Sequence, residues 1–376
     1  MADIEKPVVV AMGENPTLIW GMSNSERISR IASKLGLTFG DGQGPRLLVD
    51  SGFVFDPPLL RHMAGQPGSV LLHEGRPVIA HVSGPAQAEG VAQAMRTGAR
   101  LPPGLEPIHY GEGFTLYNDE LRKREQPFLL PLTPETVRQS ERASYFGAYK
   151  GVTDLLTKYL WPEWALIITR LAARVGMTPN MVTGVGAVLC VLSFWLFWQG
   201  RYWEGLGAGL IFMVLDTVDG KLARCTITSS KLGNMFDHGI DLVHPPFWYW
   251  AWIVGLKHVG LPLTDREFAW VMGAILSAYV VQRLLEGAFI AAFKIHPHVW
   301  RPFDSRFRLI TARRNPNMLI LFLSAVAGRP DYGIIAVAAW AVISLVVHLA
   351  QLGQALLLRS RGREITSWLS EQPPRA

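Results

Sequence analysis

The chain has 376 residues, of which 49% are hydrophobic and only 18% are charged. Soluble domains average roughly 25% charged residues, so this composition argues against a single soluble domain, and its hydrophobicity argues against a disordered chain. The net charge is +6, and two cysteines are too few for a disulfide framework, so nothing points to an oxidising compartment. The N-terminal residues contain no secretory hydrophobic region, so we expect the first domain to stay in the cytoplasm.

Residues 1–135 are expected to form a cytoplasmic α/β domain. Apolar positions repeat at helical spacing over residues 25–35, and Gly36 ends that predicted helix. Short apolar or β-branched runs predict strands at residues 8–10, 47–49, 69–72 and 77–80. Strands that alternate with helices favour a parallel sheet. The charged and proline-containing stretch 121–134 is typical of a linker.

Residues 136–178 are expected to contain a linker and an amphipathic helix. Apolar side chains that include Trp164 are interleaved with Lys158, Arg170 and Arg174. An apolar face with tryptophan and a basic opposite face are typical of a helix that lies in the membrane interface. The alternative is a surface helix packed on the soluble domain; the neighbouring apolar segment favours the interfacial position.

Six apolar segments follow, and we expect each to cross a hydrocarbon core of about 30 Å. They cover residues 181–199, 205–219, 239–259, 268–293, 317–327 and 332–358. The second and fifth are short or carry polar residues. The expected fold is therefore mostly α, with a six-span domain over residues 179–360 preceded by the interfacial helix and the α/β domain. Residues 361–376 are expected to be a cytoplasmic tail.

The distribution of lysine and arginine predicts the orientation in the membrane. These residues gather after the second, fourth and sixth segments and are sparse on the other side. Because positively charged loops stay in the cytoplasm, both termini and the active site are expected to face it, in a bacterial-type inner or cell membrane.

Four aspartates lie at the ends of the second and third predicted spans. Asp216 and Asp219 are three residues apart, and Asp237 and Asp241 are four apart, so each pair projects from one helix face. Carboxylates beside hydrocarbon normally face a polar cavity and are functional. Their combined charge requires cations, and oxygen ligands favour Mg2+, Mn2+ or Ca2+ over zinc. Two divalent ions side by side are typical of diphosphate chemistry.

Three further residues of this stretch support such chemistry. Gly220 lets a phosphate or nucleotide approach the backbone, and Arg224 can bind a diphosphate with two hydrogen bonds. Gly233 lets the second and third spans pack closely or leaves room for a substrate. The competing interpretation is a solvated loop in which the aspartates pair with neighbouring lysines and Arg224.

The whole stretch resembles the motif D-x2-D-G-x2-A-R-x8-G-x3-D-x3-D of the CDP-alcohol phosphotransferases. Every fixed position is filled, by Asp216, Asp219, Gly220, Ala223, Arg224, Gly233, Asp237 and Asp241. Upstream, residues 177–183 resemble the T-P-N-x-V-T segment that begins the first span in this family. The resemblance covers about residues 155–360.

The resemblance implies a role for each matching residue. Asp216, Asp219, Asp237 and Asp241 would bind two Mg2+ or Mn2+ ions, and Asp241 would also take the proton from the acceptor hydroxyl. The residues implied for the CDP group are Gly220, Arg224, Pro179, Asn180 and Thr183.

The implied reaction transfers a substituted phosphate from a CDP-alcohol to an acceptor hydroxyl and releases CMP, in phospholipid or phosphodiester biosynthesis. The partners would be a CDP-linked donor such as CDP-diacylglycerol, an alcohol acceptor and the bilayer, with one substrate a lipid and no nucleic acid. Relatives usually form homodimers. An intramembrane prenyltransferase and an ion-coupled transporter remain alternatives, although prenyltransferases place their aspartates in two well-separated motifs.

Some relatives carry a fused nucleotidyltransferase that makes the CDP-alcohol, as in bifunctional enzymes that activate inositol phosphate. Residues 19–27 lie where such a domain has its glycine-rich nucleotide loop, and residues 47–57 resemble a later strand of its fold. The G-x-G-x-R run followed by Pro-Lys is absent, so Gly21 and Arg27 lack the lysine of a phosphate cradle. We therefore expect a non-catalytic relative of that domain; the alternative is a bifunctional enzyme.

Basic residues form a second candidate site, for the phosphate of the acceptor or of a lipid. Phosphatidylinositol-phosphate synthases of this family use basic residues in this region for the acceptor phosphate. The candidates are Arg283, Arg306, Arg308, Arg313 and Arg314. For the loop, the alternative is contact with anionic lipid headgroups. Arg283 lies within a predicted span and needs a partner, either Glu286 or a substrate phosphate.

Overall fold

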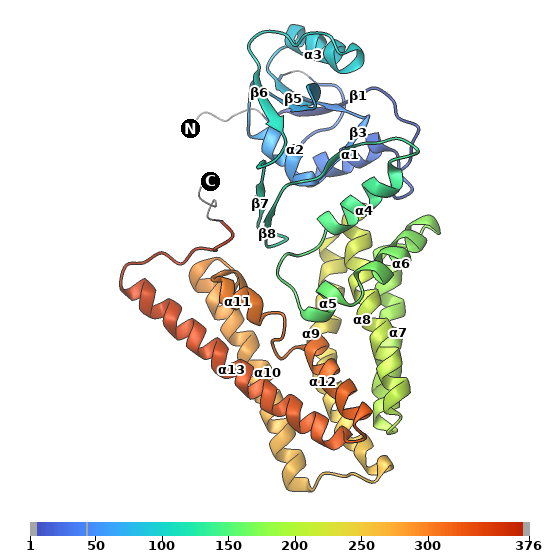
Figure 1. Ribbon diagram of the computed structural model, residues 1–376, viewed down its shortest axis with the longest axis vertical. Coiled ribbons are helices and arrows are strands. Elements are labelled where there is room, and N and C mark those ends of the chain that lie inside the picture. The colour runs from blue at the N-terminus through green and yellow to red at the C-terminus, as the bar shows by residue number, and fades with distance from the viewer. Residues whose placement is uncertain (1–5, 43, 371–376) are drawn as a thin grey trace.

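The structure, a computed structural model, describes residues 6–42 and 44–370. An α/β part formed by the N-terminal third of the chain lies above a helical part (Figure 1). The strands are β1 (Val8–Met12), β2 (Arg46–Asp50), β3 (Phe53–Phe55), β4 (Ser69–His73), β5 (Arg76–Val82), β6 (Glu106–Tyr110), β7 (Leu116–Asn118), β8 (Lys123–Glu125) and β9 (Leu129–Pro131). The helices of this part are α1 (Asn24–Lys34), α2 (Pro57–Ala64) and α3 (Pro85–Thr97).

The central sheet has five strands in the order β1-β2-β5-β4-β6. The predicted strands and the helix after Ser23 are confirmed. The sheet is mixed where a parallel sheet was expected: β1 is parallel to β2 and β4 to β6, but β5 runs antiparallel to both β2 and β4. The reason is local. Glu74 and Gly75 both have positive φ, 51° and 79°, which is the conformation of a two-residue hairpin turn and cannot support a crossover connection.

The predicted linker at residues 121–134 is also wrong, because this stretch is folded into the α/β part. β8 pairs with β7 in a hairpin, and β9 pairs with β3. Leu129 is buried in the core beside Phe55, so apolar contacts hold the stretch in place. The β7–β8 hairpin extends from the α/β part toward the helical part (Figure 1).

Three helices connect the two parts where one amphipathic helix was expected: α4 (Val137–Gly147), α5 (Leu155–Tyr159) and α6 (Pro162–Arg174). Trp161, directly before α6, is fully buried and donates a hydrogen bond from Nε1 to Thr217 Oγ1 at 3.0 Å. The opposite face of α6 exposes Trp164, Ile167 and Leu171. This helix therefore has one face fixed to the helical part and one exposed apolar face.

The helical part contains six helices at the predicted spans, together with short helices in the loops. They are α7 (Pro179–Trp198), α8 (Tyr202–Cys225), α9 (Lys231–Gly255), α10 (Asp265–Phe293), α12 (Arg314–Val326) and α13 (Pro330–Ser360), with η1 (Leu256–Val259), η2 (Pro297–Val299) and α11 (Pro302–Phe307) between them. Helix α7 packs against α8 and α9, and α13 packs against α10 and α12. Among the described residues, α7, α10 and α13 are long and apolar enough to cross a membrane.

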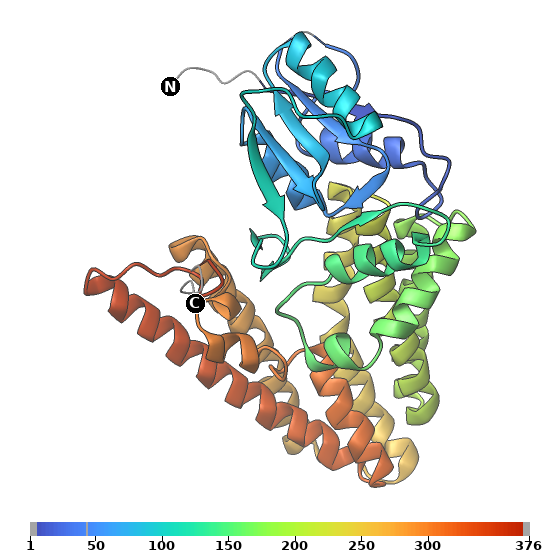
Figure 2. The same ribbon diagram turned by 45° about the horizontal axis from the view of Figure 1, so that its top comes forward.

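The loop between α8 and α9 anchors the two parts to each other. Ile227 has a left-handed conformation with φ of 55°, and its side chain is buried in the hydrophobic core of the α/β part. From α1, Arg30 donates a hydrogen bond to the carbonyl of Thr226 at 2.7 Å, and Lys34 donates to Ser229. Figure 2 shows the α/β part seated over this end of the helices.

Candidate active site

Two of the predicted metal ligands, Asp216 and Asp219, lie in the C-terminal half of α8, and Asp241 lies in the N-terminal half of α9. Asp219 is buried, and its Oδ2 accepts a hydrogen bond of 2.6 Å from Thr183 Oγ1 on α7. Asp216 and Asp241 are joined by one guanidinium: Arg314 donates to Asp216 at 2.7 Å and also to Asp241. The side chain of Asp237 lies outside the described part of the structure.

These aspartates fit a divalent cation. Their donor atoms are all carboxylate oxygens, which hard cations such as Mg2+ and Mn2+ prefer. The guanidinium of Arg314 compensates part of the negative charge of the pair Asp216 and Asp241. A cation beside Arg314 would complete the neutralisation that three or four carboxylates need.

Two cavities meet at Gly220. The first, of about 390 Å³, is lined by Asp219, Gly220 and Gly233 and by the predicted nucleotide residues Pro179, Asn180 and Thr183. The second, of about 540 Å³, is lined by Asp216, Gly220 and Asp241. Although Asp216 and Asp219 are one turn apart on α8, Asp219 lines the first cavity and Asp216 lines the second, so the pair does not line one common cavity as its spacing predicts. The two cavities share the backbone of Gly220.

The first cavity also contains residues that the sequence did not single out for it. Trp20, Gly21, Glu26 and Arg30 of the α/β part form its wall. Local sequence patterns do not show which distant segments touch. The contribution of the α/β part to this cavity therefore becomes visible only in the structure, where the α8–α9 loop packs against that part.

Arg224, predicted to bind the nucleotide, lines the second cavity instead of the first. Its Nε donates a hydrogen bond of 3.1 Å to the carbonyl of Ala148, and its guanidinium lies against Gly220, where a Cβ would be 3.2 Å from Nη2. Arg224 therefore sits at the junction of the two cavities.

Most of the predicted phosphate-binding arginines line the second cavity: Arg283, Arg308, Arg313 and Arg314. Arg306 is exposed on α11 and is not part of this lining. Arg283 pairs with Glu286 at 3.1 Å, which is one of the two partners predicted for it. Arg122 and Lys150 line the same cavity, and the sequence analysis missed both.

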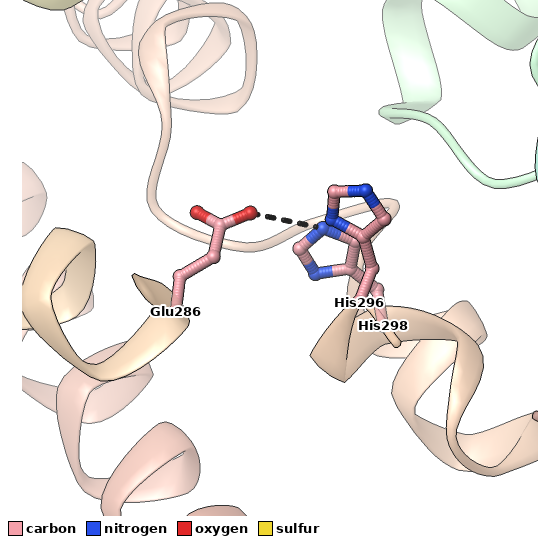
Figure 3. A group of neighbouring side chains, drawn as sticks. All are labelled: Glu286, His296 and His298. Carbon is pink, nitrogen blue, oxygen red and sulfur yellow. Dashed lines mark ion pairs between the residues drawn. The ribbon is translucent and has the colours of Figure 1, made fainter. Parts of the chain in front are cut away.

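Figure 3 shows a group of possible metal ligands formed by Glu286, His296 and His298. All three line the same cavity as these arginines, and Glu286 pairs with two of them. His298 Nε2 lies 3.3 Å from Glu286 Oε1, and burial lowers the pKa of both imidazoles. Glu286 also accepts a hydrogen bond of 2.6 Å from Arg313. The carboxylate is therefore already engaged by two guanidinium groups and one imidazole.

In the α/β part, the loop that resembles a nucleotide loop is occupied by structural contacts. Arg27 is 1% exposed and donates a hydrogen bond of 3.0 Å to the carbonyl of Phe55. Burial lowers its pKa to about 10. Gly21 lies against the carbonyl of Ala173 at the end of α6, where a Cβ would be 3.7 Å from that oxygen.

A family model for CDP-alcohol phosphatidyltransferase matches residues 176–368. Cholinephosphotransferase 1 of Gallus gallus is 36% identical over 134 residues, which are 32% of this chain and 38% of that protein. Archaetidylinositol phosphate synthase of Pyrococcus horikoshii is 26% identical over 179 residues, which are 46% of this chain and 83% of that protein. The chain thus spans well under half the length of the cholinephosphotransferases it matches.

Among solved structures, Mycobacterium tuberculosis phosphatidylinositol phosphate synthase with CDP-DAG bound aligns at 20% identity and a TM-score of 0.40, over 50% of this chain and 92% of that chain. The same protein has been crystallised with manganese and citrate. The family match covers more than half of the chain and includes every aspartate of the site. With its apolar helices, this integral membrane protein belongs to the CDP-alcohol phosphatidyltransferase family.

Proposed function

We propose that this protein transfers a substituted phosphate from a CDP-alcohol to the hydroxyl of an acceptor and releases CMP. The observation that carries the proposal is the meeting of the two cavities at Gly220, with Asp219 on one side and Asp216 and Asp241 on the other. We call the first cavity the donor cavity and the second the acceptor cavity. A donor diphosphate at their junction would lie between the bound nucleotide and the acceptor, as the transfer requires.

The chain's own groups support each part of the reaction. Thr183 fixes the carboxylate of Asp219, and Asn180 and Gly233 shape the cavity for the cytidine nucleotide. Divalent cations bound by the aspartates, Asp237 included, would neutralise the diphosphate and stabilise CMP as the leaving group. Asp241 lines the acceptor cavity, its side chain is 44% exposed to solvent, and it takes the proton of the acceptor hydroxyl as general base.

Arg314 is assigned a positioning role in this proposal. It holds Asp216 and Asp241 from two different helices at a fixed separation, which orients Asp241 toward the acceptor cavity. Arg283, Arg308 and Arg313 provide the positive charge for a phosphate group on the acceptor or lipid side.

The α/β part is proposed to be non-catalytic and to form one wall of the donor cavity. Arg27, which a phosphate-binding loop would present to solvent, is buried against Phe55. The domain's contribution is instead the contact of Trp20, Gly21 and Arg30 with the donor cavity.

The membrane topology is proposed as six spans with both termini and the Lys294–Pro316 loop in the cytoplasm, because basic residues gather on that side. The exposed apolar face of α6 would lie in the membrane interface. A homodimer is proposed from the family resemblance. Single cysteines at Arg30 and Arg306 should be labelled from the same membrane face, and labelling from opposite faces would contradict the topology.

The test of the proposed reaction is CMP release by the purified full-length protein. A panel of CDP-linked donors, including CDP-diacylglycerol, is incubated with phosphorylated and unphosphorylated alcohols in the presence of Mg2+ or Mn2+. Asp241→Asn should lower the rate by about 10²- to 10⁴-fold with metal binding less affected, since a general base contributes on that scale. CMP release that survives EDTA would contradict the mechanism.

A further inference from the structure

The turn of the β7–β8 hairpin brings a cation of the α/β part into the acceptor cavity. Arg122, directly before β8, lines this cavity together with Arg308 and Arg313. Arg122 has a left-handed backbone with φ of 52°, which is uncommon for a non-glycine residue. Its amide donates a hydrogen bond of 3.1 Å to the carbonyl of Asp119, which closes the turn.

The hairpin is fixed to the segment that follows α4. Gly151 donates its amide hydrogen to the carbonyl of Leu121 at 2.8 Å. A Cβ on Gly151 would lie 2.6 Å from the carbonyl oxygen of Arg122 and 2.6 Å from Cβ of Lys123, so only glycine permits this contact. Lys123 is buried and donates a hydrogen bond to the carbonyl of Gly147. Arg122 is therefore held in place from both sides.

The arginines of this cavity have more hydrogen-bond donors than the protein satisfies. Nε and Nη1 of Arg308, and Nε of Arg313, are buried and have no hydrogen-bond partner within the described part of the chain. Burial and then the nearby Arg313 lower the pKa of both Arg122 and Arg308. Buried donors and mutual repulsion of this kind are relieved by an anion with several oxygens.

The group in Figure 3 supports an anion in preference to a metal. Glu286 is bound by Arg283 and Arg313 and lies beside His298. A metal ion at Glu286, His296 and His298 would have to displace these arginines and stay close to their charges. The carboxylate instead orients Arg313, whose Nη2 it binds while Nε is left for another partner.

We propose that Arg122 of the α/β part completes the phosphate site assigned above to Arg308 and Arg313, and that this added cation makes the transferase selective for an acceptor alcohol that carries a phosphomonoester group. The inference rests on the proposed function for the identity of the reaction. The α/β part then has a second role, because it supplies one of the three cations that bind the acceptor.

The first experiment compares kinetics of the full-length protein and its variants. Glycerol 3-phosphate and inositol 1-phosphate serve as acceptors, each beside the corresponding unphosphorylated alcohol. Arg122→Ala should raise the KM for the phosphorylated acceptor by at least about tenfold and leave the donor KM unchanged, as expected for loss of a charged hydrogen bond. Arg122→Lys should restore part of the loss. Gly151→Ala should have a similar effect, because it displaces the hairpin without deleting Arg122.

The matched control is Arg124→Ala, on the same hairpin. Arg124 donates hydrogen bonds to the carbonyls of Leu369 and Ser370. It is not among the described residues that line the acceptor cavity. Arg124→Ala should leave the KM values for the phosphorylated acceptor and for the donor near those of the unmodified protein. Equal effects of the Arg122 and Arg124 variants, or equal use of phosphorylated and unphosphorylated alcohols, would overturn the proposal.

A binding measurement keeps the subsite testable if no transferase activity is found. In neutral-lipid nanodiscs at constant ionic strength, inorganic phosphate should raise the thermal midpoint of the unmodified protein, and Arg122→Ala should require at least about ten times more phosphate. If phosphatidic acid in the nanodisc abolishes the effect of phosphate, the ligand is a lipid headgroup and the acceptor assignment is wrong. Zinc binding that His298→Ala removes, without protection by phosphate, would also overturn it.

Discussion

Replacing Gly233 by alanine should weaken donor binding without weakening the fold. A Cβ at this position would lie 2.8 Å from Oδ1 of Asn180 and 3.1 Å from Oγ of Ser230. The first distance is too short for a stable contact, so the amide of Asn180 must rotate away from α9. Asn180 lines the donor cavity, and its displacement would change the shape of the nucleotide site.

The size of the effect follows from these contacts. Ser230 caps α9 by accepting a hydrogen bond of 3.0 Å from the amide of Gly233, and a weakened cap costs about 0.5–2 kcal/mol. Alanine recovers about 1 kcal/mol through its higher helix propensity, so folding stability should change little. Loss of the Asn180 contact with the donor should cost about 1–2 kcal/mol, which raises the donor KM about 5- to 30-fold.

The assay is CMP release at saturating acceptor over a range of CDP-diacylglycerol concentrations. Gly239→Ala is the matched control, because Gly239 lies in the same helix and its Cβ would meet no atom of the described residues within 4 Å. We expect Gly233→Ala to raise the donor KM with the acceptor KM nearly unchanged, and Gly239→Ala to change neither. Identical donor KM values for the two variants would refute the close approach of α7 and α9 as a determinant of the nucleotide site.

Three further predictions concern the α/β part. Ile227→Ala should lower the free energy that holds the two parts together by about 2–5 kcal/mol, because it removes a buried apolar side chain. Hydrogen exchange in the α8–α9 loop should then increase, and unchanged exchange would show that the anchor is unimportant. Burial raises the pKa of Asp56 to about 7, so the folded state retains a proton that the unfolded state loses near pH 4. Thermal stability should therefore fall as pH rises from 5 to 7 and then level off. Asp56→Asn should flatten this dependence; parallel curves for the two proteins would contradict the buried carboxyl. Incubation with CTP, Mg2+ and alcohol phosphates should release no pyrophosphate, and release that Arg27→Ala abolishes would show a working nucleotidyltransferase.

The sequence predicts the helical part well because its signals are local. Apolar length and the spacing of the aspartates are properties of single helices, so the helices that carry Asp216, Asp219 and Asp241 lie where expected. The pairing of Arg283 with Glu286 is predictable for the same reason, since the two residues are one turn apart on α10.

The contributions of the α/β part to the two cavities depend on contacts between distant segments, which periodicity does not encode. Arg122 lies in a stretch whose charge and prolines are typical of a linker, and only the pairing of β7 with β8 shows it to be a hairpin. Arg314, a predicted phosphate-binding residue, also joins Asp216 to Asp241, and this contact among three helices could not be predicted from the sequence. The left-handed conformation of Ile227 is likewise imposed by the domain into which it packs.

The most direct test of the central claim is to follow both products of the reaction by mass spectrometry. The unmodified protein with Mn2+ and the donor and acceptor that react in the panel above should form CMP and the phosphodiester product in equal amounts. Asp219→Asn should form neither, and EDTA should stop the reaction until Mn2+ is restored. CMP without the phosphodiester, or equal product from Asp219→Asn, would contradict the assignment of these aspartates to phosphate transfer.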